Sequence, residues 1–216
     1  MGQTFGFKLP AAEEKAVSSA KYGASILIVL DLIRQTLDLS GDVAECGVFR
    51  GHTLIPMAIY LKQKAPGKRI FALDSFSGFD ESVEKDIEFG GAYSGMKQVG
   101  GFSGTSDKLV QDKLRRTGTY DLVELVVGYF NRTLPVLSGK KFSFVHLDCD
   151  LYESYRICLD FFYPRMVRGG IILIDEYHEP IWPGCTKAVD QFLEDKAERP
   201  IPIERGCFSK FYIQKL

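Results

Sequence analysis

The sequence has no long apolar run, no excess of one charge and no closely paired cysteines, and each absence excludes a class of protein. The longest apolar run, residues 24–33, is interrupted by Asp31 and is too short to cross a bilayer. It also begins too far from the N-terminus to be a signal peptide. A net charge of −1 offers no basic surface for a phosphate backbone. We therefore expect no membrane and no nucleic-acid partner, and a small-molecule or protein partner instead.

The cysteines are five in number, scattered and without a CxxC pair. This pattern predicts a reduced, cytoplasmic protein without a structural zinc site. A chain of 216 residues, 45% of them hydrophobic, is the size of one globular domain with a full core. We expect residues 1–216 to form that single domain.

Periodic patterns predict alternating helices and strands. Apolar residues at helical spacing indicate an amphipathic helix over residues 22–38, with another at about 11–20 packed beside it; the apolar face of these N-terminal helices covers the sheet or serves a homo-oligomer contact. Further helical stretches follow at about 53–64, 107–116, 151–163 and 185–197. Strand-like runs lie at 42–48, 69–76, 122–128, 142–148, 170–177, around 201–204 and at 207–214.

This alternation predicts an α/β fold, a mostly parallel seven-stranded sheet with helices on both faces. The last two strands are too close in sequence for a crossover helix, so we expect an antiparallel hairpin at one edge. Residues 77–105 contain seven glycines and show no clear period. Such a long interval is typical of a lid over a site or of a disordered insertion, and both remain open.

Acidic residues follow several of the predicted strands. Ligands collect at the carboxyl ends of strands in open parallel sheets, so these residues mark one candidate rim. They are Glu45, Asp74, Asp148, Asp150, Asp175 and Glu176.

The stretch ECGVFRGHT supplies a glycine turn between the first strand and its helix. Gly47 and Gly51 allow a ligand to approach the backbone closely, and Thr53 is placed to cap the helix. The spacing is GxxxG rather than GxGxxG, which disfavours a dinucleotide. Asp74 ends the second strand, where a carboxylate can accept hydrogen bonds from both ribose hydroxyls. Together these features favour an adenosyl ligand without a pyrophosphate.

Asp148, Asp175 and Glu176 are predicted to lie on adjacent strand ends, about 5 Å apart. Carboxylates that close repel one another unless a cation lies among them. An all-oxygen set favours Mg²⁺ over zinc. The alternative is that Asp148 and Asp150 cap the helix that follows them.

Six motifs in this order resemble the macrocin O-methyltransferase family: DVAECGVFRGHT, LDSFSGF, VVGYFNRTLP, FVHLDCDLYESY, GGIILIDEY and PGCTKAVDQF. The similarity runs from about residue 40 to the C-terminus, and HLDCDLYES followed by LIDEY is its most specific part. It implies a Rossmann-like class I methyltransferase that uses S-adenosylmethionine and Mg²⁺, mainly on hydroxyls of sugars in natural products.

The resemblance assigns roles to particular residues. It makes Asp148, Asp175 and Glu176 the Mg²⁺ ligands and Asp150 the general base, although the family usually has Asp-Asp where this chain has Asp175 and Glu176. Residues that it assigns to S-adenosylmethionine are Glu45, Gly47, Val48, Phe49, Gly51, Thr53, Asp74, Ser75, Gly128, Tyr129 and Asp148.

The stretch after the fifth strand contains two further candidates. His178 and Trp182 are placed to contact an acceptor ring, or Trp182 anchors the loop by ordinary packing. His146 is expected to point into the packing of the sheet, without a ligand partner. Two alternatives to a sugar O-methyltransferase stay open: a catechol-type enzyme, and a non-catalytic protein that binds an adenosyl ligand.

Overall fold

A computed structural model describes residues 20–90, 97–205 and 208–216. The helix predicted at about residues 11–20 lies outside this part of the chain, except for residue 20. The longer predicted helix is present as α2, Ala20–Gln35, and ends three residues earlier than its apolar pattern.

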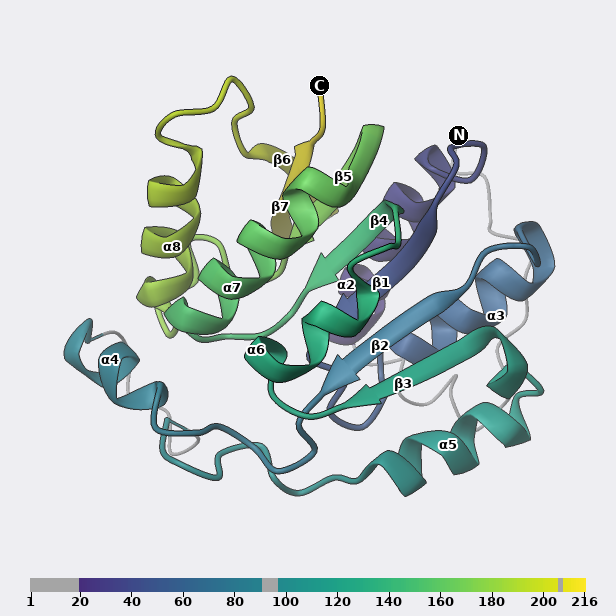
Figure 1. Ribbon diagram of the computed structural model, residues 1–216, viewed down its shortest axis with the longest axis horizontal. Coiled ribbons are helices and arrows are strands. Elements are labelled where there is room, and N and C mark those ends of the chain that lie inside the picture. Colours follow the sequence, from purple (N-terminus) through teal and green to yellow (C-terminus); the bar gives the residue numbers. More distant parts are fainter. Residues whose placement is uncertain (1–19, 91–96, 206–207) are drawn as a thin grey trace.

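One seven-stranded sheet forms the centre of the described structure (Figure 1). Its strands lie in the order β3-β2-β1-β4-β5-β7-β6, and all neighbours are parallel except the pairs β5 with β7 and β7 with β6. The predicted parallel sheet with an antiparallel hairpin at one edge is therefore confirmed. The strands are β1 (Asp42–Cys46), β2 (Ile70–Asp74), β3 (Val123–Val127), β4 (Phe142–Leu147), β5 (Met166–Ile174), β6 (Ile201–Arg205) and β7 (Phe208–Gln214).

Helices cover both faces of the sheet, α2 and α3 behind it and α6, α7 and α8 in front in Figure 1. The helices after α2 are α3 (Leu54–Lys64), α4 (Val83–Glu88), α5 (Asp107–Arg116), α6 (Phe130–Thr133), α7 (Tyr152–Phe162) and α8 (Pro183–Leu193). Side chains from the two faces of the sheet pack into two separate hydrophobic cores. On β4, for example, Phe144 packs with α2 and α3, whereas Val145 and Leu147 pack with α7 and α8.

Burial on both faces explains the apolar character of the strands. Every residue of β4 is buried, including Ser143 and His146. A strand covered on both sides reads as a nearly continuous apolar run. A polar residue inside such a run needs a partner, and His146 has two, as described below.

The interval predicted to be without regular structure contains a short helix, α4, between long connecting stretches. In Figure 1 it lies beyond the carboxyl ends of the strands. The prediction missed α4 because six residues are too few to establish a helical period. Val83 and Asp86 are its buried positions, so the helix is held by contacts with the rest of the chain.

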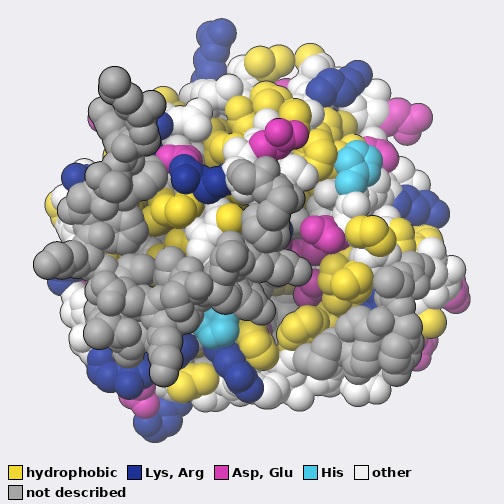
Figure 2. Space-filling model, turned by 180° about the vertical axis from the view of Figure 1, so that it is seen from behind, with side chains coloured by type: hydrophobic (Ala, Val, Ile, Leu, Met, Phe, Trp, Pro, Cys, Tyr) yellow, Lys and Arg dark blue, Asp and Glu magenta, His cyan; other side chains and the backbone are white. Residues whose placement is uncertain are grey.

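The surface agrees with the near-neutral composition. On the face in Figure 2, Lys and Arg side chains lie in several separate places among acidic and hydrophobic ones. Within the described ranges, the helices all fall short of the length and apolar character that a membrane span needs.

Candidate active site

A cavity of about 720 Å³ opens at the carboxyl ends of the central strands. It lies where the chain order reverses between β1 and β4, the usual ligand position in open parallel sheets. Every residue assigned above to the cofactor lines this cavity except Gly51, and Asp150 and Asp175 line it as well. Glu176, His178 and Trp182 are not part of the lining.

Asp74 organises the first turn of the site. Its Oδ2 accepts hydrogen bonds of 2.7 Å from the backbone amides of Val48 and Phe49, and its Oδ1 accepts one of 2.7 Å from the amide of Phe76. A carboxylate has about four acceptor positions, so one remains for a ligand. Asp74 therefore shapes the loop around the cavity, a task that the sequence analysis did not foresee.

Gly47 is required by a close approach between two strand ends. Its φ is +90°, and a Cβ atom there would lie 1.7 Å from the carbonyl oxygen of Asp148. The β1 turn and the acidic end of β4 are thus in direct backbone contact. Thr53 occupies the predicted N-cap position of α3, but its side chain makes no capping hydrogen bond.

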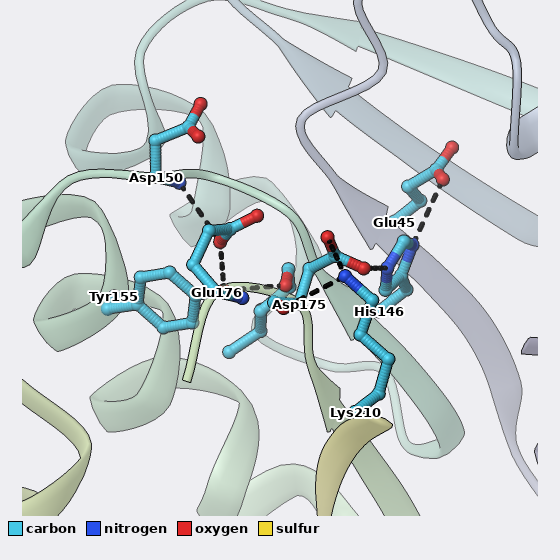
Figure 3. A network of polar contacts seen from close by, with 8 residues as sticks. Glu45, His146, Asp150, Tyr155, Asp175, Glu176 and Lys210 are labelled. Atoms are coloured by element: carbon cyan, nitrogen blue, oxygen red, sulfur yellow. Dashed lines mark hydrogen bonds and ion pairs between the residues drawn. The ribbon is translucent and has the colours of Figure 1, made fainter. Parts of the chain in front are cut away.

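A row of charged side chains crosses four strands at the floor of the site (Figure 3). His146 Nδ1 lies 3.2 Å from Oε1 of Glu45, and its Nε2 lies 3.3 Å from Oδ1 of Asp175. Asp175 Oδ2 is also paired with the ammonium group of Lys210. The expectation that His146 has no partner is wrong, since its ring bridges β1 and β5.

These contacts shift the protonation of the row. Burial alone would lower the pKa of His146, but the hydrogen bonds to Asp175 and Glu45 raise it to about 10, which makes the ring an imidazolium. Burial raises the pKa of Glu45 to about 7 despite the contact with His146. Glu45 Oε2 is buried and has no hydrogen-bond partner among the described residues. Glu45 lines the cavity, and an acceptor without a partner there fits a ligand ammonium group.

Asp148 and Asp175 form the acidic centre of the site. Among the described residues, the group whose donor atoms all lie within 4.8 Å of one another consists of His146, Asp148 and Asp175. Burial and the neighbouring Asp175 raise the pKa of Asp148. Both ring nitrogens of His146 are engaged, so the two aspartates are the available ligands. Their oxygen donors fit a hard divalent cation.

Glu176 lies next to this centre, close enough to Asp148 for each carboxyl group to affect the pKa of the other. Its Oε2 accepts a hydrogen bond from the hydroxyl of Tyr155 and another, of 3.3 Å, from the backbone amide of Asp150. Burial and the nearby Asp148 carboxylate raise its pKa well above the usual range. Its role as a third metal ligand stays a prediction; in the structure it supports the loop that carries Asp150.

Asp150 adopts a left-handed backbone conformation, with φ +58°. The amide of Leu151 donates to the carbonyl of Cys149 at 2.6 Å, which closes a tight turn around Asp150. The chain therefore does not continue extended into the helix, and Leu151, not Asp150, is the N-cap of α7. The alternative that Asp150 caps α7 is wrong. Strained residues of this kind cluster at functional sites.

The turn places the Asp150 carboxylate in an acidic environment. Burial, followed by the carboxylates of Asp148 and Asp175, raises its pKa well above the usual range. The dipole of α7 favours the ionised carboxylate, but burial and the like charges of Asp148 and Asp175 outweigh it. A raised pKa makes Asp150 a stronger base than an exposed aspartate.

The segment 77–105 supplies the cap that Asp150 does not. Asp86 of α4 is fully buried, and its Oδ2 accepts a 2.9 Å hydrogen bond from the amide of Tyr152, the first residue of α7. Its Oδ1 lies against Gly184 near the start of α8, where a Cβ would be 2.0 Å away. The carboxylate thus lies near two helix N-termini, which favour negative charge, but burial outweighs them and raises its pKa to about 6.

The two residues predicted to contact an acceptor ring do not line the cavity, and their contact with an acceptor stays a prediction. The His178 ring lies 4.1 Å from that of Tyr177 and 5.3 Å from that of Phe211, measured between centroids. Trp182 is buried and contacts the edge of Phe79, which itself lines the cavity. Trp182 therefore anchors the wall of the site, as the packing alternative proposed.

Sequence reasoning missed three residues of the site: Asp86, His146 and Lys210. Asp86 and Lys210 lie far in sequence from the residues that they contact, so no motif signals them. For His146 there was a signal: a histidine inside a strand buried on both faces requires polar partners.

The strand order and the cavity at its switch point define a class I methyltransferase. The structure is similar to those of the O-methyltransferase NovP (TM-score 0.74, 26% identity, 89% of this chain and 79% of that one) and the calicheamicin methyltransferase CalS11 (TM-score 0.78, 20% identity, 99% and 97%). Residues 29–205 match the macrocin O-methyltransferase (TylF) family, and the chain belongs to it. The predicted resemblance is confirmed, and the protein is an O-methyltransferase by fold and family.

Two curated relatives act on natural products. Demethyldecarbamoylnovobiocin O-methyltransferase of Streptomyces niveus is 30% identical over 82% of this chain and 70% of its own length. Mycinamicin III 3''-O-methyltransferase of Micromonospora griseorubida is 30% identical over 70% of this chain and 60% of its own length. The matched regions thus leave about a third of each relative's length without a counterpart in this chain.

Proposed function

We propose that this protein transfers the methyl group of S-adenosylmethionine to a hydroxyl of a sugar or related small natural product and requires Mg²⁺. One observation carries the proposal: Asp148, Asp150 and Asp175 line the same cavity as the turn built on Glu45, Gly47 and Asp74. Carboxylates for a cation and a base therefore lie beside a turn suited to the cofactor.

The residues around the first turn support the cofactor assignment. Glu45 offers an unpartnered buried oxygen to the ammonium group of the methionine part. Asp74 retains one acceptor position for the ribose, and Gly128 and Tyr129 line the cavity where the resemblance puts the adenine. These residues would fix the methyl group in place, and such positioning accounts for a large part of the rate in bimolecular transfers.

Asp148 and Asp175 would hold the divalent cation, and Glu176, which also supports the loop of Asp150, stays the predicted third ligand. When bound, such a cation orients the acceptor oxygens and lowers the pKa of the reacting hydroxyl. Asp150 would accept the proton of that hydroxyl, because its raised pKa and its place in the cavity suit a base.

Titration calorimetry with S-adenosylmethionine, with and without Mg²⁺, tests the proposal, followed by a screen of sugar and catechol acceptors for methyl transfer. We expect cofactor binding without the metal and turnover only with it. Full turnover in EDTA would remove Mg²⁺ from the mechanism. Cofactor binding without transfer to any acceptor would favour the non-catalytic alternative, and transfer to catechols alone would favour the catechol-type enzyme.

A further inference from the structure

Lys210 brings a cation of the protein itself into the acidic centre. It lies on β7, the antiparallel neighbour of β5, one position beyond the pair formed by Ile174 and Phe211. That register puts Lys210 directly opposite Asp175. Its ammonium group donates to the carbonyl oxygen of Asp175 at 3.0 Å and pairs with Oδ2 of the same residue. Figure 3 shows the side chain reaching toward the Asp175 carboxylate.

Both oxygens of Asp175 are therefore occupied by cationic groups of the chain. Oδ2 is paired with Lys210, and Oδ1 lies 3.3 Å from His146 Nε2. The Lys210 side chain is only 14% exposed, so water screens this pair weakly. Each oxygen keeps a further acceptor position, so a third cation would bind Asp175 beside these two positive groups and against their repulsion.

Lys210 also interacts electrostatically with Glu176 and Asp148, the other two predicted metal ligands. Attraction to Asp175, then to Glu176, raises the pKa of Lys210 despite its burial, and Asp148 adds to the effect. The ammonium group is thus the counter-charge for the same three carboxylates that the sequence assigns to Mg²⁺. Without a counter-charge, carboxylates this close destabilise the fold.

We propose that Lys210 is an internal counter-ion that competes with the divalent cation for Asp175 and so limits the metal affinity of the site. The inference rests on the proposed function, because it takes Asp148 and Asp175 as the metal ligands. Lys210 holds the carboxylates together when no divalent cation is bound, and its positive charge opposes such a cation at Asp175. The arrangement keeps the acidic loop folded at the expense of affinity for the ion.

The test measures Mn²⁺ binding by electron paramagnetic resonance in the intact protein, which gives a metal affinity without any turnover. We expect Lys210→Met to bind Mn²⁺ on the order of tenfold more tightly, because a positive charge next to the ion is removed. Lys210→Arg, which keeps the charge, should stay near the wild-type affinity. Lys215→Met is the control, because it also removes one positive charge. Lys215 follows β7 directly and lies beside Gly170, at the other end of β5 from Asp175, so this variant should change the affinity little.

Thermal unfolding supplies a second readout. In EDTA, Lys210→Met should unfold at a lower temperature than wild type, and saturating Mg²⁺ should raise its melting temperature by more than it raises that of wild type. Lys210→Gln, which can still donate to the Asp175 carbonyl, replaces the Met variant if that one does not fold.

The outcomes separate this inference from the proposed function. Weaker or equal Mn²⁺ binding in both neutral variants, with binding intact in wild type, would overturn the competition and leave the metal site standing. Absence of specific Mn²⁺ binding in wild type and all variants would overturn the metal site itself, and the competition with it.

Discussion

The carboxylate of Asp86 accepts a 2.9 Å hydrogen bond from the backbone amide of Tyr152, 66 residues later in the chain. Through this bond a residue of the segment 77–105 caps the helix that begins two positions after Asp150. The ion pair of Lys85 with Glu153, at 2.7 Å, adds a second contact between the same elements. The segment predicted to be a lid is thus attached to the part of α7 that borders the cavity.

Asp86 predicts a pH dependence of stability. Burial raises its pKa from 3.8 to about 6 in the folded protein. Because the folded state holds the proton more tightly than the unfolded state, stability is lost as pH rises from about 4 to about 6. Asp86→Asn removes this titration and keeps an acceptor for Tyr152. We expect the variant to gain roughly 2 kcal/mol relative to wild type between about pH 4 and pH 7.5.

Urea unfolding at the two pH values measures the difference. Glu84→Gln is the matched control, because it makes the same charge change on the exposed side of α4. The prediction is wrong if both variants show the same pH profile relative to wild type.

Asp150→Asn separates the base from the metal ligands. Asparagine tolerates the left-handed conformation at φ +58°, and its amide still leaves the backbone contact with Glu176 in place. It does not take up the proton, so the turnover number should fall by roughly 10²-fold or more. Cofactor and Mn²⁺ affinity should stay within a few-fold of wild type. A large loss of Mn²⁺ binding would make Asp150 a ligand instead.

The pH–rate profile gives a second measure of the same residue. Since the pKa of Asp150 is raised, wild-type activity should increase as pH rises through its titration. This limb should be missing in Asp150→Asn, whose residual rate should grow only at high pH, where hydroxide takes the proton. If Asp150→Asn kept this rise of activity with pH, the rise would belong to the titration of another group.

Asp74→Ala should act on both the ligand and the loop. Loss of a charge-assisted acceptor should weaken S-adenosylmethionine by about 2–3 kcal/mol in calorimetry. Because the carboxylate also binds the amides of Val48 and Phe49, amide exchange at these positions should speed up in the ligand-free variant. Weakened binding with unchanged exchange would show that Asp74 acts on the ligand alone. Unchanged affinity would end its assignment to the cofactor.

Glu176→Gln and Asp175→Asn distinguish a supporting residue from a ligand. Glutamine can keep the contacts with Tyr155 and the Asp150 amide, so Mn²⁺ affinity should fall only a few-fold, whereas Asp175→Asn should reduce it by on the order of 10²-fold. Paramagnetic resonance compares the two variants directly. Equal losses would place Glu176 among the ligands.

The sequence by itself determined the succession of strands and helices along the chain, the parallel sheet, the hairpin and the rim of carboxylates. These follow from local patterns: apolar runs for strands buried on both faces, helical spacing between them, and too few residues for a crossover before β7. Gly47 also predicted that another group comes close to the backbone at this turn, although only the structure shows that this group is the carbonyl of Asp148.

Only the tertiary structure decided which charges meet. His146 bridges Glu45 and Asp175, Lys210 faces Asp175, and Asp86 caps α7, each across 29 or more residues of chain. Such contacts depend on strand order and on how a connecting segment folds back, and no local pattern encodes either. The pKa of Asp150 also depends on the tertiary structure, because burial and distant carboxylates raise it, and both are properties of the assembled site.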